Sequence, residues 1–321
     1  MLKTLMVAVA FGAVAAVAVW MVVAGSGKAR FKLGKSFEYN TKALEQVAPE
    51  LIAWQELDPI NPGLSELRGL AVGPDDAICV AGDKVVMVLG PDGEQLRSIT
   101  LEAAPMCLAV DENGLLYIGM KDHVEVYDAG GAKKDSWLNQ GDRAFLTSIA
   151  VADDSVYVAD AGNRWVTRYD TNGKNPGRIT GKNDARNVNG FFVPSPNFDV
   201  ATDEGRSVWI VDPGRHAIVQ YRASGEVITS WGNGGVAIDS FCGCCSPSHI
   251  ALRSDGSFVT SERGLERVKV HGPGGEFINV VVAPKDFDDD TEGMDLAVDS
   301  NDRILVLDPS RKQVRVFVEK E

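Results

Sequence analysis

From about residue 67 to the C-terminus, short runs of alternating apolar and polar residues are separated by turns rich in glycine, asparagine and aspartate. A period of two is typical of β-strands, because successive side chains of a strand point to opposite faces. No long stretch with the 3.6-residue period of a helix interrupts this region. The pattern therefore predicts an all-β domain.

The alternating runs form a sequence repeat. Each repeat holds a short apolar strand, a polar turn, a second apolar strand, a turn with Asp or Arg, a third alternating strand, a glycine turn and usually a fourth strand. One aligned position recurs six times, at spacings of 38, 41, 49, 52 and 46 residues. Repeats of this length are typical of four-stranded propeller blades, so the sequence predicts a six-bladed β-propeller. The aligned position is occupied by Gly69, Cys107, Ser148, Asn197, His249 and Asp295.

The last repeat ends at Glu321 after only three strands. The segment Pro49–Leu57 resembles the fourth strand of another repeat, Val227–Trp231. We therefore expect this segment to complete the last blade and close the ring, which makes residues 49–321 one propeller domain.

Several short motifs within the repeats resemble the NHL repeat. They are Ser148-Ile-Ala-Val151, Val156-Tyr-Val-Ala-Asp160, Asn163-Arg164 and Ser230-Trp231-Gly232. The resemblance covers about residues 50 to 321 and implies a six-bladed propeller of NHL type. NHL propellers include protein-binding modules, RNA-binding modules and a lyase branch, so the resemblance implies no particular reaction.

An uncharged apolar run of twenty residues, Leu5 to Ala24, precedes the repeats. As a helix it would cross roughly 30 Å of hydrocarbon, so it predicts an N-terminal transmembrane helix within residues 1–27. A cleavable signal segment is the alternative. Residues 28–48 are then a linker. Short anchors of this shape usually export the domain that follows, so we expect an extracytoplasmic, periplasmic body, although the basic residues after the run favour the opposite orientation.

The chain carries 32 Lys and Arg against 45 Asp and Glu, a formal net charge of −13. This charge repels polyanions, and no cluster of Lys and Arg with interleaved aromatic residues appears outside the stretch next to the apolar run. Nucleic acid is therefore not an expected partner.

In a propeller blade, the loop that enters the blade and the turn between its second and third strands share one face of the ring. This arrangement should gather the loops Phe241–Pro247, Asp286–Glu292 and 183–196 on that face, and concave mouths of this kind are preferred ligand sites. The leading hypothesis is a membrane-anchored binding or scaffold module of the cell envelope that engages a protein or small ligand there. Whether the protein is an enzyme stays open.

The strongest chemical signal is a cysteine-rich loop, because Cys242, Cys244 and Cys245 fall within four residues and His249 follows closely. Thiolates and imidazole suit zinc, copper or iron, so one interpretation is a metal or cluster site. A disulfide, for instance Cys242 with Cys245, and a reactive or redox-active thiol are the other interpretations. The alternative function is accordingly a metal-dependent or redox enzyme, or a metal-binding protein.

Polar residues of the first strands should also meet near the central channel, where Asn197, Asp199 and Asp295 join His249. They either line a water-filled channel or capture a ligand or metal. The resemblance to the amidating-lyase branch implies zinc held by channel histidines, but only His249 matches, which disfavours a three-histidine site.

Two acidic groups have less specific interpretations. The loop with Asp288, Asp289, Asp290 and Glu292 offers hard oxygens for calcium, or it is a solvated acidic surface. The three aspartates that end second strands are expected to cap backbone N–H groups in their turns, each with an arginine nearby. These are Asp160, Asp212 and Asp308, with Arg164, Arg215 and Arg311.

Overall fold

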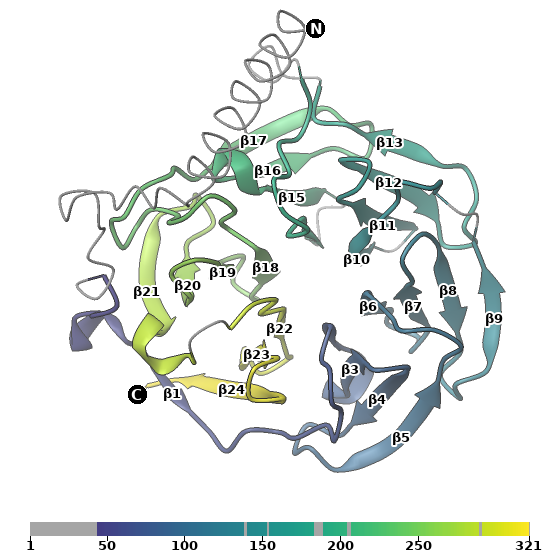
Figure 1. Ribbon diagram of the computed structural model, residues 1–321, viewed down its shortest axis with the longest axis horizontal. Coiled ribbons are helices and arrows are strands. Elements are labelled where there is room, and N and C mark those ends of the chain that lie inside the picture. Colours follow the sequence, from purple (N-terminus) through teal and green to yellow (C-terminus); the bar gives the residue numbers. More distant parts are fainter. Residues whose placement is uncertain are drawn as a thin grey trace, which may run out of the picture. The chain divides into compact units, whose positions relative to one another are not determined.

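The computed structural model of the protein describes residues 44–137, 140–152, 154–182, 189–203, 207–288 and 291–320. In these residues six antiparallel sheets of four strands each surround a central axis, so the all-β, six-bladed propeller is confirmed (Figure 1). Each sheet is a meander whose first strand is innermost, and the polypeptide passes from blade to blade around the ring (Figure 1).

The first three blades follow the chain in order. Their strands are β2 (Gly69–Val72), β3 (Ile78–Gly82), β4 (Val85–Leu89) and β5 (Gln95–Thr100); β6 (Cys107–Val110), β7 (Leu116–Gly119), β8 (Val124–Tyr127) and β9 (Lys133–Ser136); and β10 (Leu146–Ala152), β11 (Ser155–Asp160), β12 (Trp165–Asp170) and β13 (Gly177–Ile179).

The other three blades include one strand from the opposite end of the chain. Their strands are β14 (Val200–Thr202), β15 (Val208–Asp212), β16 (Ala217–Tyr221) and β17 (Val227–Trp231); β18 (His249–Leu252), β19 (Phe258–Glu262), β20 (Arg267–His271) and β21 (Phe277–Val282); and β22 (Leu296–Val298), β23 (Ile304–Asp308), β24 (Gln313–Glu319) and β1 (Trp54–Glu56). Short 3₁₀ turns lie at Pro49–Leu51, Pro74–Asp76, Pro213–Arg215 and Pro284–Asp286.

Blade 6 takes its fourth strand from the N-terminal side of the domain. β1 pairs antiparallel with β24, with Gln55 opposite Val318, and the backbone N–H of Leu57 donates to Val316 at 2.8 Å. Ile52 also forms a parallel bridge to Val280 of blade 5. The segment that resembles a fourth strand therefore occupies that place and contacts the neighbouring blade as well.

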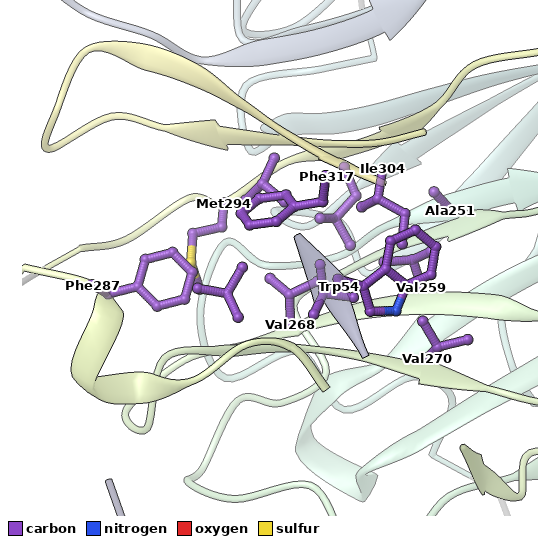
Figure 2. Packing of buried hydrophobic residues seen from close by; sticks show 13 residues of the cluster. Trp54, Ala251, Val259, Val268, Val270, Phe287, Met294, Ile304 and Phe317 are labelled. Carbon is purple, nitrogen blue, oxygen red and sulfur yellow. The ribbon is translucent and has the colours of Figure 1, made fainter. Parts of the chain in front are cut away.

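Trp54 of β1 is buried between blades 5 and 6, where it packs with Val259 and Val270 on one side and Ile304 on the other (Figure 2). Its indole N–H donates to the Asn279 side chain at 2.9 Å. Comparable apolar clusters, each built from two adjacent blades, fill the other interfaces. A four-stranded sheet is apolar on both faces, and a closed ring is what buries both.

The expected transmembrane segment within residues 1–27 lies outside the described residues, as does most of the linker 28–48. In the part of the chain that the structure describes, no helix has the length and apolar character needed to cross a membrane.

The structure corrects one alignment. Ser148 of β10 lies opposite Ala159 of β11, and the equivalent position in blade 4 lies opposite Val211. That position is Asp199, whose carbonyl accepts from the Val211 N–H at 3.0 Å, and not Asn197 as expected. The aligned residues are therefore Gly69, Cys107, Ser148, Asp199, His249 and Asp295.

Candidate functional site

The loops that enter the blades and the turns after the second strands are fastened to each other on one face, which we call the loop-rich face. In four blades an acidic side chain in or beside the turn accepts a hydrogen bond from a backbone N–H of the loop that enters the same blade. A carboxylate held this way makes a strong, charge-assisted bond that fixes the loop. The acceptors are Asp83 (from Ser65 and Glu66), Asp160 (from Phe145), Asp212 (from Phe192) and Glu262 (from Cys242), at 2.7–3.0 Å.

The cysteine-rich loop between β17 and β18 lies on this face and is held from two blades. The Ser246 hydroxyl donates to the Arg263 carbonyl at 3.1 Å and accepts the Arg263 N–H at 3.0 Å. The Ser246 carbonyl lies 2.9 Å from Nδ1 of His216, a residue in the second turn of blade 4. The peptide bond between Ser246 and Pro247 is cis. The loop is therefore an ordered part of the propeller surface.

Beneath this loop lies a network of three buried charges. Glu262, Arg267 and Lys269 are each at most 2% exposed. Glu262 Oε1 lies 2.6 Å from Arg267 Nε and 2.9 Å from Lys269 Nζ, and both cations also donate to the Ser240 carbonyl. Burial lowers the pKa of Lys269, while the Glu262 carboxylate opposes that shift. Because buried charges are tolerated only with such partners, the network fixes residues 240–242 against blade 5.

The three cysteines of the loop differ in exposure. Cys244 is exposed, Cys242 is half-buried and Cys245 is buried. The sulfurs of Cys244 and Cys245 lie 2.9 Å apart. Burial raises the pKa of the Cys245 thiol, and the neighbouring Cys244 thiol adds to the effect. The loop thus presents one accessible and one buried sulfur side by side.

His249 does not lie beside the cysteines but beside Asp199 and Asp295, at the central channel. Its Nδ1 lies 3.4 Å from Asp295 Oδ1 and 3.8 Å from Asp199 Oδ2. Over the described residues, no group of three or more His, Cys, Asp or Glu side chains is arranged to hold a metal ion. The assignment of Cys242, Cys244, Cys245 and His249 as metal ligands stays a prediction.

The central channel contains a cavity of about 240 Å³ lined by all six innermost strands. Cys107, Ser148, Asp199 and Asp295 belong to its lining, whereas Asn197 does not. The side chains of Asp199, His249 and Asp295 come from three consecutive blades and follow one another around the channel. The structure therefore brings together three of the four polar residues expected there.

The polar residues of the channel also connect adjacent blades. Asp199 Oδ2 accepts the N–H of Ile250 at 2.7 Å, and Asp295 Oδ2 accepts the N–H of Leu70 at 2.8 Å. The Ser148 hydroxyl lies 3.3 Å from the N–H of Val200 in the same relationship. An innermost strand has no further strand to pair with, so these side chains satisfy N–H groups that the sheet leaves unpaired. Their clearest role is to join the blades.

The channel charges alter one another's protonation. Burial raises the pKa of Asp199 to about 6, with His249 opposing the shift and Asp295 adding to it. Burial alone would lower the pKa of His249, but the carboxylates of Asp295 and Asp199 outweigh burial and raise it. Burial raises the pKa of Cys107 as well, and the charges of Asp295 and Asp199 add to this. The channel can therefore hold a proton near neutral pH but not a thiolate.

The turn aspartates cap backbone N–H groups as expected. Asp160 accepts the N–H of Asn163 at 3.0 Å, and Asp308 accepts that of Arg311 at 3.0 Å. Arg215 pairs with Asp212 at 2.6 Å. The guanidinium of Arg311 instead donates to Asp288 of the acidic loop.

The acidic loop is fastened to the turns of two blades. Asp288 is bound by Arg311 at 2.8 Å, and Glu292 pairs with Arg263. The other two acids proposed for calcium, Asp289 and Asp290, lie outside the described residues.

One feature of the loop-rich face is not apparent from the motifs. A cavity of about 490 Å³ between blades 3 and 4 has four basic side chains in its lining. Each of them falls in a loop, turn or strand end that the repeat alignment places near this face, which is the signal that would have identified the group. They are Arg143, Arg164, Arg178 and Lys182.

Comparisons with known proteins support the propeller fold but identify neither a family nor a function. No protein-family model matches the chain. No curated protein matches it either. The NHL resemblance therefore stays an expectation, while the propeller fold itself rests on the observed sheets.

Solved propeller structures resemble the chain at low sequence identity. A streptogramin B lyase structure shares 9% identity with a TM-score of 0.58, covering 83% of this chain and 98% of that chain. Virginiamycin B lyase from Staphylococcus aureus shares 12% with a TM-score of 0.56, covering 83% and 99%. The WD40 propeller domain of Doa1 shares 14% with a TM-score of 0.56, covering 79% of each chain. At such identities the likeness establishes the fold alone.

Proposed function

We propose that this protein is a membrane-anchored propeller of NHL type that acts as a binding module, and that its loop-rich face engages a protein or small ligand. The main support is the way in which this face is held together. Loops from successive blades are bound to the turns beside them by buried or half-buried carboxylates, so the surface is ordered before any partner arrives. A preorganised surface loses less conformational entropy on binding.

The shape of the face also favours binding. The basic cavity between blades 3 and 4 adjoins a second cavity of about 240 Å³, and Gly162 lines both. Ser195, in the lining of the second cavity, lies beside the Cys245 sulfur. The two cavities thus extend from blade 3 to Ser195, next to the cysteine-rich loop, and such concavities are where ligands bind.

Site-specific photo-crosslinking in cells that produce the protein tests the proposal. Phe192 and Val236 are half exposed, in the loop that enters blade 4 and in the loop that precedes the cysteines. A photoreactive amino acid at either position should give an adduct of defined mass. The control positions Leu96 and Ile228 are 57% and 42% exposed on outer strands and should give none. Adducts from the outer strands alone would place the binding surface elsewhere.

A second candidate function, a redox or metal-binding site at the cysteine-rich loop, is favoured by the contact between the Cys244 and Cys245 sulfurs. Zinc, copper or iron is the proposed metal, because thiolates bind these ions. Metal analysis of the full-length protein purified under reducing conditions tests this. Stoichiometric metal that is lost in Cys244→Ser but kept in Cys79→Ala supports the metal site. Metal-free protein whose loop cysteines are oxidised excludes it and supports a disulfide.

The extracytoplasmic placement of the propeller belongs to the same proposal. Protease added to intact cells should then reach the exposed loops only after the outer barrier is opened. Full protection until the inner membrane is lysed would place the domain in the cytoplasm.

A further inference from the structure

The cavity between blades 3 and 4 has a strongly basic lining in the part of the chain that the structure describes. Its lining includes Arg143, Arg164, Arg178 and Lys182 together with the amides of Asn163 and Asn189. Among the described residues of this lining there is no carboxylate. In a chain with a net charge of −13, four cations gathered in one cavity are a local reversal of sign.

These cations are also free to bind. Within the described residues, none of the four basic side chains forms an ion pair or hydrogen bond. The nearby buried carboxylate, Asp160, is occupied by the N–H groups of Phe145 and Asn163 and by the Asn163 amide at 2.6 Å. Cations that neutralise no neighbouring acid concentrate positive potential in a concave site, and this potential attracts anions.

The cavity offers a flat apolar surface as well. The guanidinium of Arg178 lies over the Trp165 ring at 4.2 Å from the ring centroid. Arg164 ends the second turn of blade 3 in a left-handed backbone conformation with φ of 61°, as do His216 in blade 4 and Lys312 in blade 6, so this conformation belongs to the repeated turn. Arginine forks recognise carboxylate and phosphate groups in two-pronged geometry.

We propose that this cavity binds a small organic anion, whose carboxylate or phosphate group contacts Arg143, Arg164 and Arg178 and whose flat portion lies near Trp165. The volume of about 490 Å³ falls in the range of small-molecule sites. Guanidinium groups supply the charge-assisted hydrogen bonds, and the aromatic ring supplies apolar contact.

This inference rests on the proposal that the loop-rich face is the binding surface, and it names a ligand class for that surface. The experiments distinguish failure of the anion site from failure of the binding face. Crosslinking from Phe192 in cells without any anion affinity would leave a protein-binding face and overturn the anion site. Anion binding without crosslinks would leave the anion site alone.

Calorimetric titration of the full-length protein in non-ionic detergent tests the site. Phenyl phosphate and benzoate serve as probes for the two anionic groups, and benzyl alcohol is the neutral control. At least one anion should bind saturably at low millimolar concentration or tighter, and the alcohol should not bind. The stronger of the two anions identifies the headgroup. Because the attraction is electrostatic, affinity should fall as salt is raised.

The variants Arg164→Gln and Arg178→Gln should each weaken binding of the preferred anion about tenfold, because each removes a charged donor. The control Arg222→Gln removes the same charge from an exposed turn of blade 4, where Arg222 pairs with Glu226, and should leave binding unchanged. Equal binding of benzyl alcohol, equal losses in Arg222→Gln and Arg164→Gln, or no saturable binding of either anion would each overturn the proposal.

Discussion

The side chain of Arg315 donates two parallel hydrogen bonds, each 2.7 Å long, to the carboxylate of Glu56. The two residues are separated by most of the domain in sequence, and their strands, β24 and β1, are the pair that closes the ring. Arg315 is 2% exposed and also donates to the Asp286 carbonyl at 3.1 Å. One buried guanidinium thus joins the closing strand, blade 6 and the loop before it.

Glu56→Gln should destabilise the propeller by about 1–3 kcal/mol, because it removes the charged acceptor of both Arg315 hydrogen bonds and leaves the buried guanidinium with only the Asp308 carboxylate, 3.8 Å away, as an ionic partner. Urea unfolding of the full-length protein measures the loss. Glu94→Gln, which changes an exposed glutamate in the third turn of blade 1, should cost almost nothing. Equal losses in the two variants would mean that the pair contributes nothing to closure.

Trp54→Ala should cost about 3–5 kcal/mol, as for other large buried aromatic residues, since it empties the space between blades 5 and 6. The substitution also removes the hydrogen bond to Asn279. Thermal or urea unfolding measures the effect, with Leu57→Ala as the matched change at a residue that is 37% exposed. A loss in Trp54→Ala no larger than in Leu57→Ala would contradict the closure described here.

The imidazole of His249 should titrate above its ordinary value of 6.5, because the neighbouring carboxylates of Asp295 and Asp199 outweigh burial. NMR titration of the histidines would show this. In Asp295→Asn the His249 midpoint should move down, whereas Asp92→Asn should not shift it. His271 is an internal reference, because burial and then the Lys269 charge lower its pKa to about 3. A His249 midpoint unaffected by Asp295→Asn would contradict the pairing.

The ionisation of Asp199 and His249 makes the free energy of unfolding depend on pH. The pKa of Asp199 is raised from 3.8 to about 6, so its contribution is present below about pH 4 and is lost as pH rises through 6. The raised pKa of His249 has the same sign, with its contribution lost above 6.5. The free energy of unfolding should therefore fall less between pH 4.5 and pH 7 in Asp199→Asn than in the native chain. Parallel declines would show that Asp199 titrates normally.

Cysteine alkylation should separate the loop thiols from the core thiols. Burial raises the pKa of Cys79 to about 11, against an ordinary value of 9, so its thiolate fraction at pH 8 falls about a hundredfold. Cys107 is buried with its pKa raised as well. Peptide mapping after brief treatment with iodoacetamide should find Cys244 modified first and these two protected until urea is added. Rapid modification of Cys107 in the native protein would contradict its burial.

The alternation of residues along the chain was sufficient to predict the strands, the number of blades and the origin of the closing strand. The strands and the closing strand were predicted from patterns within one repeat, and the number of blades from the number of repeats. The alignment in blade 4 was wrong by two residues, although a local signal existed. With Asp199 in the aligned position, the residue two places later is alanine in all six blades, namely Ala71, Ala109, Ala150, Ala201, Ala251 and Ala297.

The candidate site was predicted only in part. The sequence placed the cysteine-rich loop, the acidic loop and the turn aspartates on one face, and the described contacts join them there. It did not separate His249 from the cysteines, although they are close in sequence. His249 begins an innermost strand and its side chain pairs with Asp295 of the next blade, whereas Cys244 and Cys245 lie in the loop before that strand, one exposed and the other buried.

By itself, the sequence determined that this chain folds as a ring of six four-stranded blades, because strand periodicity and turn residues act over a few neighbouring positions. The tertiary structure decided which side chains meet. Arg315 finds Glu56 and Asp199 finds Ile250 because the ring brings separate repeats into contact. The four basic residues of the cavity come from blade 3 and its flanking loops, and the folding of that blade gathers them. Such contacts depend on loop paths and blade packing, which no local pattern encodes.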